Sequence, residues 1–321
     1  MKKFFIAIVA LAATVSCSND DIISIDRQAI GFGNPFVENS TRAAIDSSYS
    51  GGTKELTTFY VWGTVTGNGN TVNVFNGAKC TGNVNMDVWG CDQTEYWVPS
   101  CSYSFTAIVD ADSNGVATGD NDMPESITVT SDGTRDLLYA TATATTNAKA
   151  EPSQNPVAFS FSHLMSKAHF TFENTVGSDN YAFQVTDVKV SNLYTKGVYT
   201  IGATTPWAVS AVSTTPLDFG HAVYAEGAES ITNGARATSN YARTLLPATY
   251  GDDNKFIVTF KAYMLYKGKN LGSKDYTIEA KHTFAPNCAY NFVVELGAGD
   301  EITFKVTDVQ GWGEIPDIDI P

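Results

Sequence analysis

The sequence predicts an all-β protein built from antiparallel β-sandwich domains. Thr, Val, Tyr, Phe, Gly and Asn are plentiful, whereas the helix formers Glu, Lys and Arg are thin. Short runs that alternate apolar and polar residues recur between Gly- and Asn-rich turns. No long segment repeats with the helical period of 3.6 residues. With 321 residues, 43% of them hydrophobic, the chain can form about two such domains.

Strand signals begin after residue 55. The run TTFYVWGTV at 57–65 is rich in β-formers and is followed by GNGN, a turn signal. Further strands are expected in SYSFTAIVD, PESITVTSDG and RDLLYATATA. The polar stretch EPSQNP at 151–156 contains two prolines and is typical of a linker. We therefore expect an N-terminal domain over 43–155 and a C-terminal domain over 156–321.

The alternation is sharper beyond this linker. Two apolar strand faces are formed by Val157, Phe159 and Phe161 and by Ala168, Phe170 and Phe172. Two strand runs with a turn at Lys196–Gly197 are expected in YAFQVTDVKVSNLYTKGVYTIG. FIVTFKAYMLY and DYTIEAKHTF should pair as a hairpin around KGKNLGSK. AYNFVVEL and EITFKVTDV are the expected closing strands.

The N-terminus has the pattern of a targeting segment. MKK supplies positive charge, and FFIAIVALAA is an apolar run too short to span a bilayer. The run ends at Ser16–Cys17, which resembles a bacterial lipobox, although Thr14 stands where such boxes usually carry Leu. We expect residues 1–17 to be a lipoprotein signal peptide, with palmitate on Cys17. An ordinary secretory signal with an incidental cysteine is the alternative.

Four cysteines remain if Cys17 is acylated, namely Cys80, Cys91, Cys101 and Cys288. An exported protein meets an oxidising compartment, so a disulfide among the first three of these is possible. The sequence does not choose among the pairings, and buried free thiols are the alternative. No Cys-x-x-Cys pair or His/Cys spacing indicates zinc.

No motif points to catalysis, so we expect neither an enzyme nor a cofactor. The histidines at 163, 169, 221 and 282 are not spaced as metal ligands, and we interpret them as structural. There is no Gly-x-Ser-x-Gly elbow, no His-Glu-x-x-His and no phosphate loop. The carboxylates occur in turns, which does not indicate a glycosidase pair. The net charge of −14 argues against nucleic acid as a partner.

One stretch resembles half of a calcium loop. DADSNG at 110–115 would supply oxygens from Asp110, Asp112 and Asn114. The twelfth position of such a loop should be Glu, but here it is Asn121. An ordinary Asp/Asn/Gly turn is therefore the favoured interpretation, and no metal is expected.

The order of features resembles the fimbrillins, the type V pilins of Bacteroidales. The signal ending at Cys17 is followed by the strand-like QAIGFGNPFVENS, which is closed by Thr41–Arg42–Ala43. DLLYA is then followed by PVAFSFSHLMSKAHFTFEN, and PNCAYNFVVEL and EITFKVTDVQGWGE end the chain. Each piece is loose alone, but their order is more specific and covers nearly the whole chain. The resemblance implies transthyretin-like domains of Greek-key type.

The resemblance also implies a route of assembly. An arginine-specific protease would cut the lipidated precursor, and the C-terminal strand of another subunit would fill the groove that the first strand leaves. Carried onto this chain, 18–42 is the prosegment, Arg42 the cleavage residue and Ala43 the new N-terminus. The small polar residues around Arg42 suit an accessible site, and Arg27 is a poorer competitor beside Asp26. A solvated surface arginine in a linker is the alternative.

Apolar faces can be matched between the outgoing strand and the candidate incoming strands. Ile30, Phe32 and Phe36 would leave, and Ile302, Phe304 and Val306 would enter. Burying about three to five such residues is worth roughly 5–12 kcal/mol. A second candidate donor carries Ile315, Ile318 and Ile320, although its prolines limit ladder bonding. In that case EITFKVTDV would close its own domain.

These features predict the stalk subunit of a pilus that supports cell adhesion. Its partners would be other pilin subunits, including tip and anchor subunits, and an arginine-specific protease. It would be lipid-anchored in the outer membrane and then part of an extracellular fimbrium. A tip or anchor subunit is one alternative. Another is a surface lipoprotein that never polymerises and binds glycans or host proteins through exposed Trp89, Trp97 and Trp207.

Overall fold

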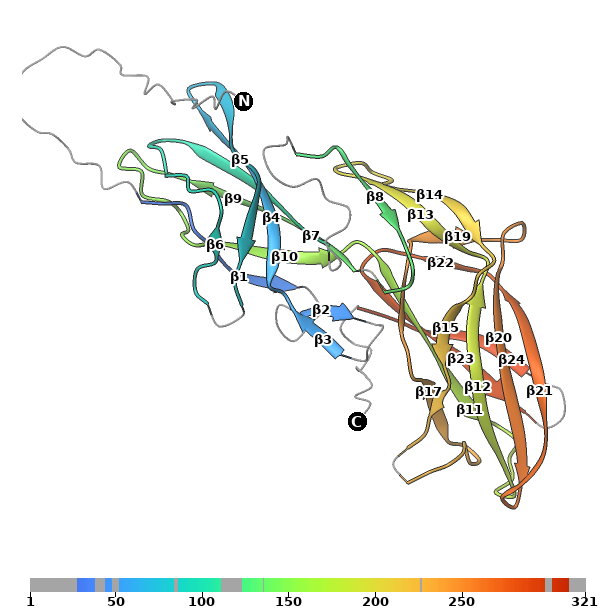
Figure 1. Ribbon diagram of the computed structural model, residues 1–321. Helices are drawn as coiled ribbons and strands as arrows, with labels where there is room; N and C mark the ends of the chain where they lie inside the picture. The colour runs from blue at the N-terminus through green and yellow to red at the C-terminus, as the bar shows by residue number, and fades with distance from the viewer. Residues whose placement is uncertain are drawn as a thin grey trace, which may run out of the picture.

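A computed structural model describes residues 28–37, 44–47, 52–83, 86–110, 123–134, 136–225, 227–297 and 302–311. Within these ranges every regular element is a strand, which confirms the predicted all-β class. Figure 1 shows two β-rich halves, with β4, β5, β7, β9 and β10 in one and β8 beside β13 and β14 in the other.

The strands follow the sequence closely. Before the crossover at 164–165 they are β1 (Phe32–Val37), β2 (Ala44–Ser47), β3 (Gly52–Glu55), β4 (Thr58–Gly67), β5 (Asn70–Thr81), β6 (Gly90–Cys91), β7 (Ser102–Asp110), β8 (Ser126–Thr130), β9 (Leu137–Thr145) and β10 (Val157–His163), and of these β8 pairs with β13 of the second half. In the second half they are β11 (Ser166–Asn174), β12 (Tyr181–Ser191), β13 (Leu193–Thr200), β14 (Trp207–Ser213), β15 (Leu217–Gly220), β16 (Ala222–Val223), β17 (Arg236–Ser239), β18 (Arg243–Leu245), β19 (Ala248–Tyr250), β20 (Phe256–Tyr266), β21 (Lys269–Ala280), β22 (His282–Phe284), β23 (Cys288–Leu296) and β24 (Ile302–Gly311).

The first half is a seven-stranded sheet in the order β1-β10-β9-β7-β4-β5-β6. Alternating side chains of these strands fill one core, in which Phe59, Phe75, Phe105 and Phe159 are almost fully buried. The β4–β5 hairpin turns at Asn68–Gly69, where both residues adopt positive φ, as the GNGN signal predicts. The alternating Val157, Phe159 and Phe161 of β10 face this same core, as predicted.

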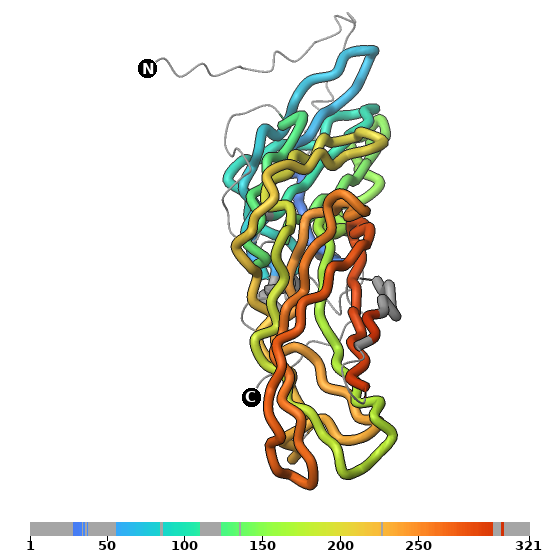
Figure 2. The backbone as a smooth tube through the Cα atoms, turned by 90° about the vertical axis from the view of Figure 1, so that its right-hand side faces the viewer, coloured from blue at the N-terminus to red at the C-terminus, as the bar shows by residue number. Residues whose placement is uncertain are grey.

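The second half is a sandwich of two sheets around a second core. One sheet has the order β16-β17-β11-β23-β24, with β18 also on β11, and the other has the order β15-β12-β20-β21. The predicted hairpin around KGKNLGSK is confirmed as β20–β21. Figure 2 shows an elongated molecule, with the β20–β21 hairpin reaching the end opposite the first half.

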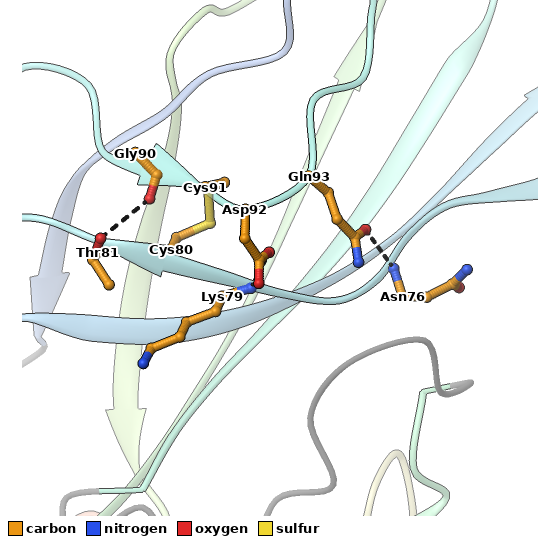
Figure 3. Close-up of a disulfide and its surroundings, with 8 residues drawn as sticks. All are labelled: Asn76, Lys79, Cys80, Thr81, Gly90, Cys91, Asp92 and Gln93. Carbon is orange, nitrogen blue, oxygen red and sulfur yellow. Dashed lines mark hydrogen bonds between the residues drawn. A yellow bond between two sulfur atoms is a disulfide. The ribbon is translucent and has the colours of Figure 1, made fainter. Parts of the chain in front are cut away.

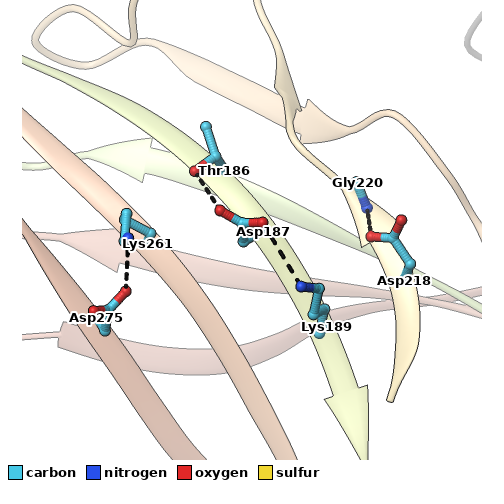
Figure 4. Close-up of polar contacts among 7 residues, drawn as sticks. All are labelled: Thr186, Asp187, Lys189, Asp218, Gly220, Lys261 and Asp275. Carbon is cyan, nitrogen blue, oxygen red and sulfur yellow. Dashed lines mark hydrogen bonds and ion pairs between the residues drawn. The ribbon is translucent and has the colours of Figure 1, made fainter. Parts of the chain in front are cut away.

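The outer side of the four-stranded sheet is polar, and its charged side chains form ion pairs with one another. Asp187 lies at a bulge of β12 with φ of 57°, and its carboxylate is 3.7 Å from the Lys189 ammonium (Figure 4). Lys261 of β20 pairs with Asp275 of β21 at 3.6 Å. These exposed pairs contribute at most about 1 kcal/mol each. This face is a solvated surface.

A third apolar cluster joins the two halves. The three-stranded sheet β14-β13-β8 covers the outer face of the first sheet, where Trp62 and Ile108 are buried. Leu164 and Met165, between β10 and β11, lie in the same cluster. The indole N–H of Trp207 donates to the carbonyl of Leu164 at 3.0 Å. The packing of the halves is therefore apolar at its centre.

Three sequence expectations differ from the structure. β10 pairs with β1 and β9 of the first sheet, so the chain crosses to the second half at 164–165, beyond the expected boundary at 155/156. Lys196–Gly197 is no turn but lies inside β13, where a side chain on Gly197 would meet Trp207 at 3.0 Å. Two strand pairs, β1–β10 and β11–β23, are parallel within the otherwise antiparallel sheets.

Candidate strand-exchange site

Residues 28–37, here named the seam segment, lie between the two ends of the seven-stranded sheet. On one side β1 pairs in parallel with β10, with Phe32 opposite Val157 and Val37 opposite Phe161. On the other side lies the wall segment, residues 86–98, which carries β6. Ala29 and Phe32 form bridges to Tyr96 and Trp89 of this wall. The seam segment therefore closes the sheet (Figure 1).

Main-chain hydrogen bonds attach the seam segment to the wall segment. The Ile30 N–H donates to the Glu95 carbonyl at 2.8 Å, and the Trp89 N–H donates to the Phe32 carbonyl at 2.7 Å. The Trp97 N–H donates to the Gln28 carbonyl at 3.1 Å. Each such bond contributes about 1 kcal/mol net.

The opposite side of the seam segment is held by β10 and the residue two before it. The Val157 N–H donates to the Gly31 carbonyl at 2.7 Å. The side-chain amide of Asn155 accepts from the Gly31 N–H at 2.9 Å and donates to the Ala29 carbonyl at 3.2 Å. Asn155 thus satisfies two main-chain groups of the seam segment that would otherwise be unpaired.

The apolar side chains of the seam segment are part of the core. Phe32 is fully buried, and its ring lies 5.1, 5.4 and 5.6 Å from the rings of Phe75, Phe105 and Phe159. Ile30 and Val37 are buried in the same cluster. The predicted face of Ile30 and Phe32 is therefore present. A bulge after Gly33 shifts the register, so that Phe36 lies in β1 opposite Ser160.

Gly33 allows a close approach between the seam and wall segments. A Cβ atom at this position would lie 2.0 Å from the Asp87 carbonyl oxygen and 3.0 Å from Cγ of Pro156. No side chain fits at such distances without displacing backbone. The glycine is therefore required for the seam segment to lie in this register.

The wall segment is tied to β5 near its middle (Figure 3). Cys80 of β5 and Cys91 of β6 form a disulfide, which settles the pairing that the sequence left open. Beside it, the Lys79 N–H donates to the Asp92 carboxylate at 2.8 Å, and the Asp92 N–H donates to the Lys79 carbonyl at 3.1 Å. The Asn76 N–H donates to the Gln93 side chain at 3.3 Å. Cys101 and Cys288 are free.

The far end of the wall segment is held at Val98. Its N–H donates to the Tyr103 hydroxyl at 2.7 Å, and its carbonyl accepts from the Thr146 hydroxyl at 2.5 Å. The pKa of Tyr103 is raised, mainly by burial, so this hydroxyl is neutral at physiological pH. Trp97 packs edge-on against the Tyr103 ring at 4.7 Å.

The first candidate donor lies in a strand of its own domain. β24 pairs with β23 along its whole length at the edge of the second sandwich, and Ile302 and Val306 are within it. The half-buried Phe304 ring stacks on Phe292 at 5.5 Å. This is the arrangement in which EITFKVTDV closes its own domain. The second candidate, with Ile315, Ile318 and Ile320, lies outside the described residues.

Several predicted sites also lie outside the described residues. They are Cys17, the cleavage residues Arg42 and Ala43, and Asp112 and Asn114 of the possible calcium loop. Asp110 ends β7. Within the described ranges there is no cluster of three His, Cys, Asp or Glu residues that could hold a metal. Those ranges also contain no helix that is long and apolar enough to cross a membrane.

The tryptophans proposed for glycan binding do not form an exposed cluster. Trp89 and Trp97 are each 2% exposed and face the core beside the seam segment. Trp207 is engaged with Leu164 between the two halves. The predicted exposed cluster is therefore wrong, because Trp89 and Trp97 are buried and the half-buried Trp207 lies apart from them in another cluster.

The histidines have structural surroundings. Nδ1 of the buried His163 lies 3.0 Å from both carboxylate oxygens of the buried Asp136, where β9 and β10 meet. His169 is buried in β11, and burial, followed by the Lys167 charge, lowers its pKa to about 4. Burial also lowers the pKa of His282, whose ring packs on Tyr290.

The sequence interpretation found the seam segment but missed the residues that hold it. Glu95 and Asn155 act through a main-chain carbonyl and a side-chain amide, and neither residue stands out in the sequence. The sequence does contain one indication of the wall segment, because Trp89 and Trp97 flank Cys91. Two aromatic residues near a disulfide favour a packed segment over a free loop.

This is a protein of two β-rich halves whose first core is completed by an N-terminal strand. The chain belongs to the fimbrillin-like family, because the family model described as Fimbrillin-like matches residues 41–312. The match begins after the seam segment. A comparison with curated protein sequences found no match.

Two solved structures share the fold. One is a candidate cell adhesion protein from Bacteroides uniformis, with 20% identity, a TM-score of 0.50, and coverage of 88% of this chain and 98% of that one. The other is a candidate cell adhesion protein from Bacteroides ovatus, with 16% identity, a TM-score of 0.50, and coverage of 89% and 98%. At these identities the likeness shows the fold alone.

Proposed function

We propose that this chain is a stalk subunit of a fimbrium, assembled by strand exchange after proteolysis. The observation that carries the proposal is the seam segment, which is buried in the first core although it precedes the expected cleavage residue Arg42. Cleavage after Arg42 would cut the covalent link between this strand and the domain that it completes. The family match, which starts at residue 41, supports the same division.

Replacing the seam segment by another strand is energetically feasible, whereas losing it without replacement is costly. Burial of Ile30, Phe32 and Val37 is worth roughly 5–9 kcal/mol as an upper estimate. The three main-chain bonds to the wall segment add about 1 kcal/mol each. An empty seam would therefore expose a large apolar groove and unpaired strand edges. A strand of similar burial from another subunit would recover most of this free energy, so exchange would be close to neutral.

Repeated strand addition would produce the fimbrium. Because the donor would come from the C-terminal region and the groove lies in the first half, the contact is head-to-tail and propagates as a filament. The donor would come from the C-terminal region, either 302–309 or the tail beyond it. The pairing of β24 with β23 favours the tail, since β24 is already used within its own domain.

The remaining steps follow the family's route. The precursor would be exported, lipidated on Cys17 and held at the outer membrane until an arginine-specific protease releases residues 18–42. The mature subunit would then polymerise with copies of itself and with tip and anchor subunits. Its role would be structural and adhesive, without catalysis.

Polymerisation of purified precursor after treatment with an arginine-specific protease tests this function. Wild type should lose residues up to Arg42 and form filaments. Arg42→Ala should remain longer and monomeric, whereas the matched control Arg27→Ala should polymerise like wild type. Trimming and polymerisation of Arg42→Ala at the wild-type rate would place the site elsewhere.

A further inference from the structure

The wall segment has two sets of attachments, and cleavage would remove one of them. Its bonds from Trp89, Glu95 and Trp97 all go to the seam segment. When that segment leaves, these groups lose their partners together. Among the described residues, its remaining bonds to the sheet are those to β5 near its middle and at Val98 at its far end, beside the packing of Trp89 and Trp97 on the core.

The non-covalent attachments to β5 are weak. β5 and β6 pair over only two residues, Cys80–Cys91 and Thr81–Gly90. The bond from the Lys79 N–H to the Asp92 carboxylate is exposed, and the return bond from the Asp92 N–H is 3.1 Å long. The bonds from the Asn76 N–H to Gln93 and from the Thr81 hydroxyl to the Gly90 carbonyl are long, at 3.3 and 3.5 Å. Water competes for such groups, so each adds little. The disulfide is therefore the strongest tie between the wall segment and β5 (Figure 3).

The side chains of the wall segment favour collapse into an empty seam. Trp89 lies on the Phe59 ring at 5.0 Å, and Trp97 lies 6.2 Å from Phe105, a ring that also contacts Phe32. Both indole N–H groups are buried without a hydrogen-bond partner. With Phe32 gone, a loose wall segment would gain by moving these large side chains into the space that it vacates.

We propose that the Cys80–Cys91 disulfide is a positioning element for strand exchange, which keeps the wall segment at strand-pairing distance while the seam is empty. This rests on the proposed function. Cys80 is fully buried in β5, so the bond anchors Cys91 to the rigid part of the sheet. Subunits without the disulfide would fold as precursors, because the seam segment itself holds the wall segment. After cleavage they would capture an incoming strand poorly.

The first test measures capture of a defined strand by the emptied groove. The probe is a labelled synthetic peptide of residues 28–37, whose place in the groove is known. Cleaved wild type should bind it, and uncleaved precursor should not. The double variant Cys80→Ser/Cys91→Ser should bind at least about 10-fold more weakly, whereas the matched control Cys101→Ser, at a free cysteine, should bind like wild type.

A second measurement separates positioning from general stabilisation. Hydrogen exchange of the amides at 89–97 should be similar in wild-type and double-variant precursors, since the seam segment protects both. After cleavage, the variant alone should lose this protection. Equal loss of protection before and after cleavage would mean that the disulfide is merely structural, and would overturn the proposal.

The outcomes distinguish the two proposals. If cleaved wild type neither binds the peptide nor polymerises, the strand-exchange function itself is wrong. If wild type does both and the folded double variant matches it, only the role of the disulfide is wrong. Should the double variant fail to fold, cleaved wild type is reduced with a dithiol after folding, and unchanged peptide binding would then contradict the proposal.

Discussion

Replacing Phe32 with Ala should destabilise the precursor strongly but leave the mature subunit unchanged. Phe32 is fully buried, and three aromatic rings surround it. Phe→Ala changes in such cores cost about 3–5 kcal/mol, through lost burial and the cavity left behind. For a domain of this size, that cost lowers the melting temperature by roughly 10–20 °C.

The assay compares thermal unfolding of the precursor and of the protease-treated, purified subunit. The two mature proteins share one sequence, so they should melt together once the cut strand has left. Phe159→Ala is the matched control, because Phe159 belongs to the same cluster but stays in the mature chain, and it should destabilise both forms. A Phe32→Ala precursor whose free energy of unfolding lies within about 0.5 kcal/mol of the wild-type value would refute the account of the seam. A difference that persists after cleavage would show that the strand remains bound.

Three further predictions concern other residues. Gly33→Val should lower the precursor's free energy of unfolding by at least about 2 kcal/mol in chemical unfolding, because its Cβ would meet the Asp87 carbonyl. Gly90→Ala is the control, because a Cβ there has room. Equal stability of the two variants would contradict the close approach at Gly33. Below pH 6.5 the unfolded chain protonates His169 while the folded chain, with its pKa of about 4, does not, so stability should fall by up to about 3 kcal/mol from pH 6.5 to 4. His169→Asn should flatten that slope in pH-dependent unfolding, and an unchanged slope would assign it to other groups. Cys17→Ala should abolish incorporation of labelled fatty acid, and continued labelling would place the lipid elsewhere.

Local patterns predicted the strands well because they depend on neighbouring residues. The alternation of Val157, Phe159 and Phe161 gave both the strand and its buried face. The same reasoning gave the buried face of Ala168, Phe170 and Phe172 in β11, but not the burial of the opposite face, which includes Lys167 and His169. Double burial comes from elements far away in the sequence, and alternation within one strand does not report it.

Partners and boundaries were harder to predict for the same reason. EPSQNP has a linker composition, yet its Asn155 clamps the seam segment and the following β10 remains in the first sheet. Gly197 was interpreted as a turn signal, but it is a glycine that admits Trp207 against a strand. In the seam, Ile30 and Phe32 were identified by their side chains, whereas the wall segment that pairs with them acts mainly through its backbone.

The central claim is that the strand that completes the first core in the precursor is absent from the assembled subunit. N-terminal sequencing and intact mass of subunits from filaments recovered at the cell surface test it directly. The account predicts chains that begin at Ala43 and contain no peptide from residues 28–37. Filament subunits that retain Ile30 and Phe32 in the same chain would contradict it.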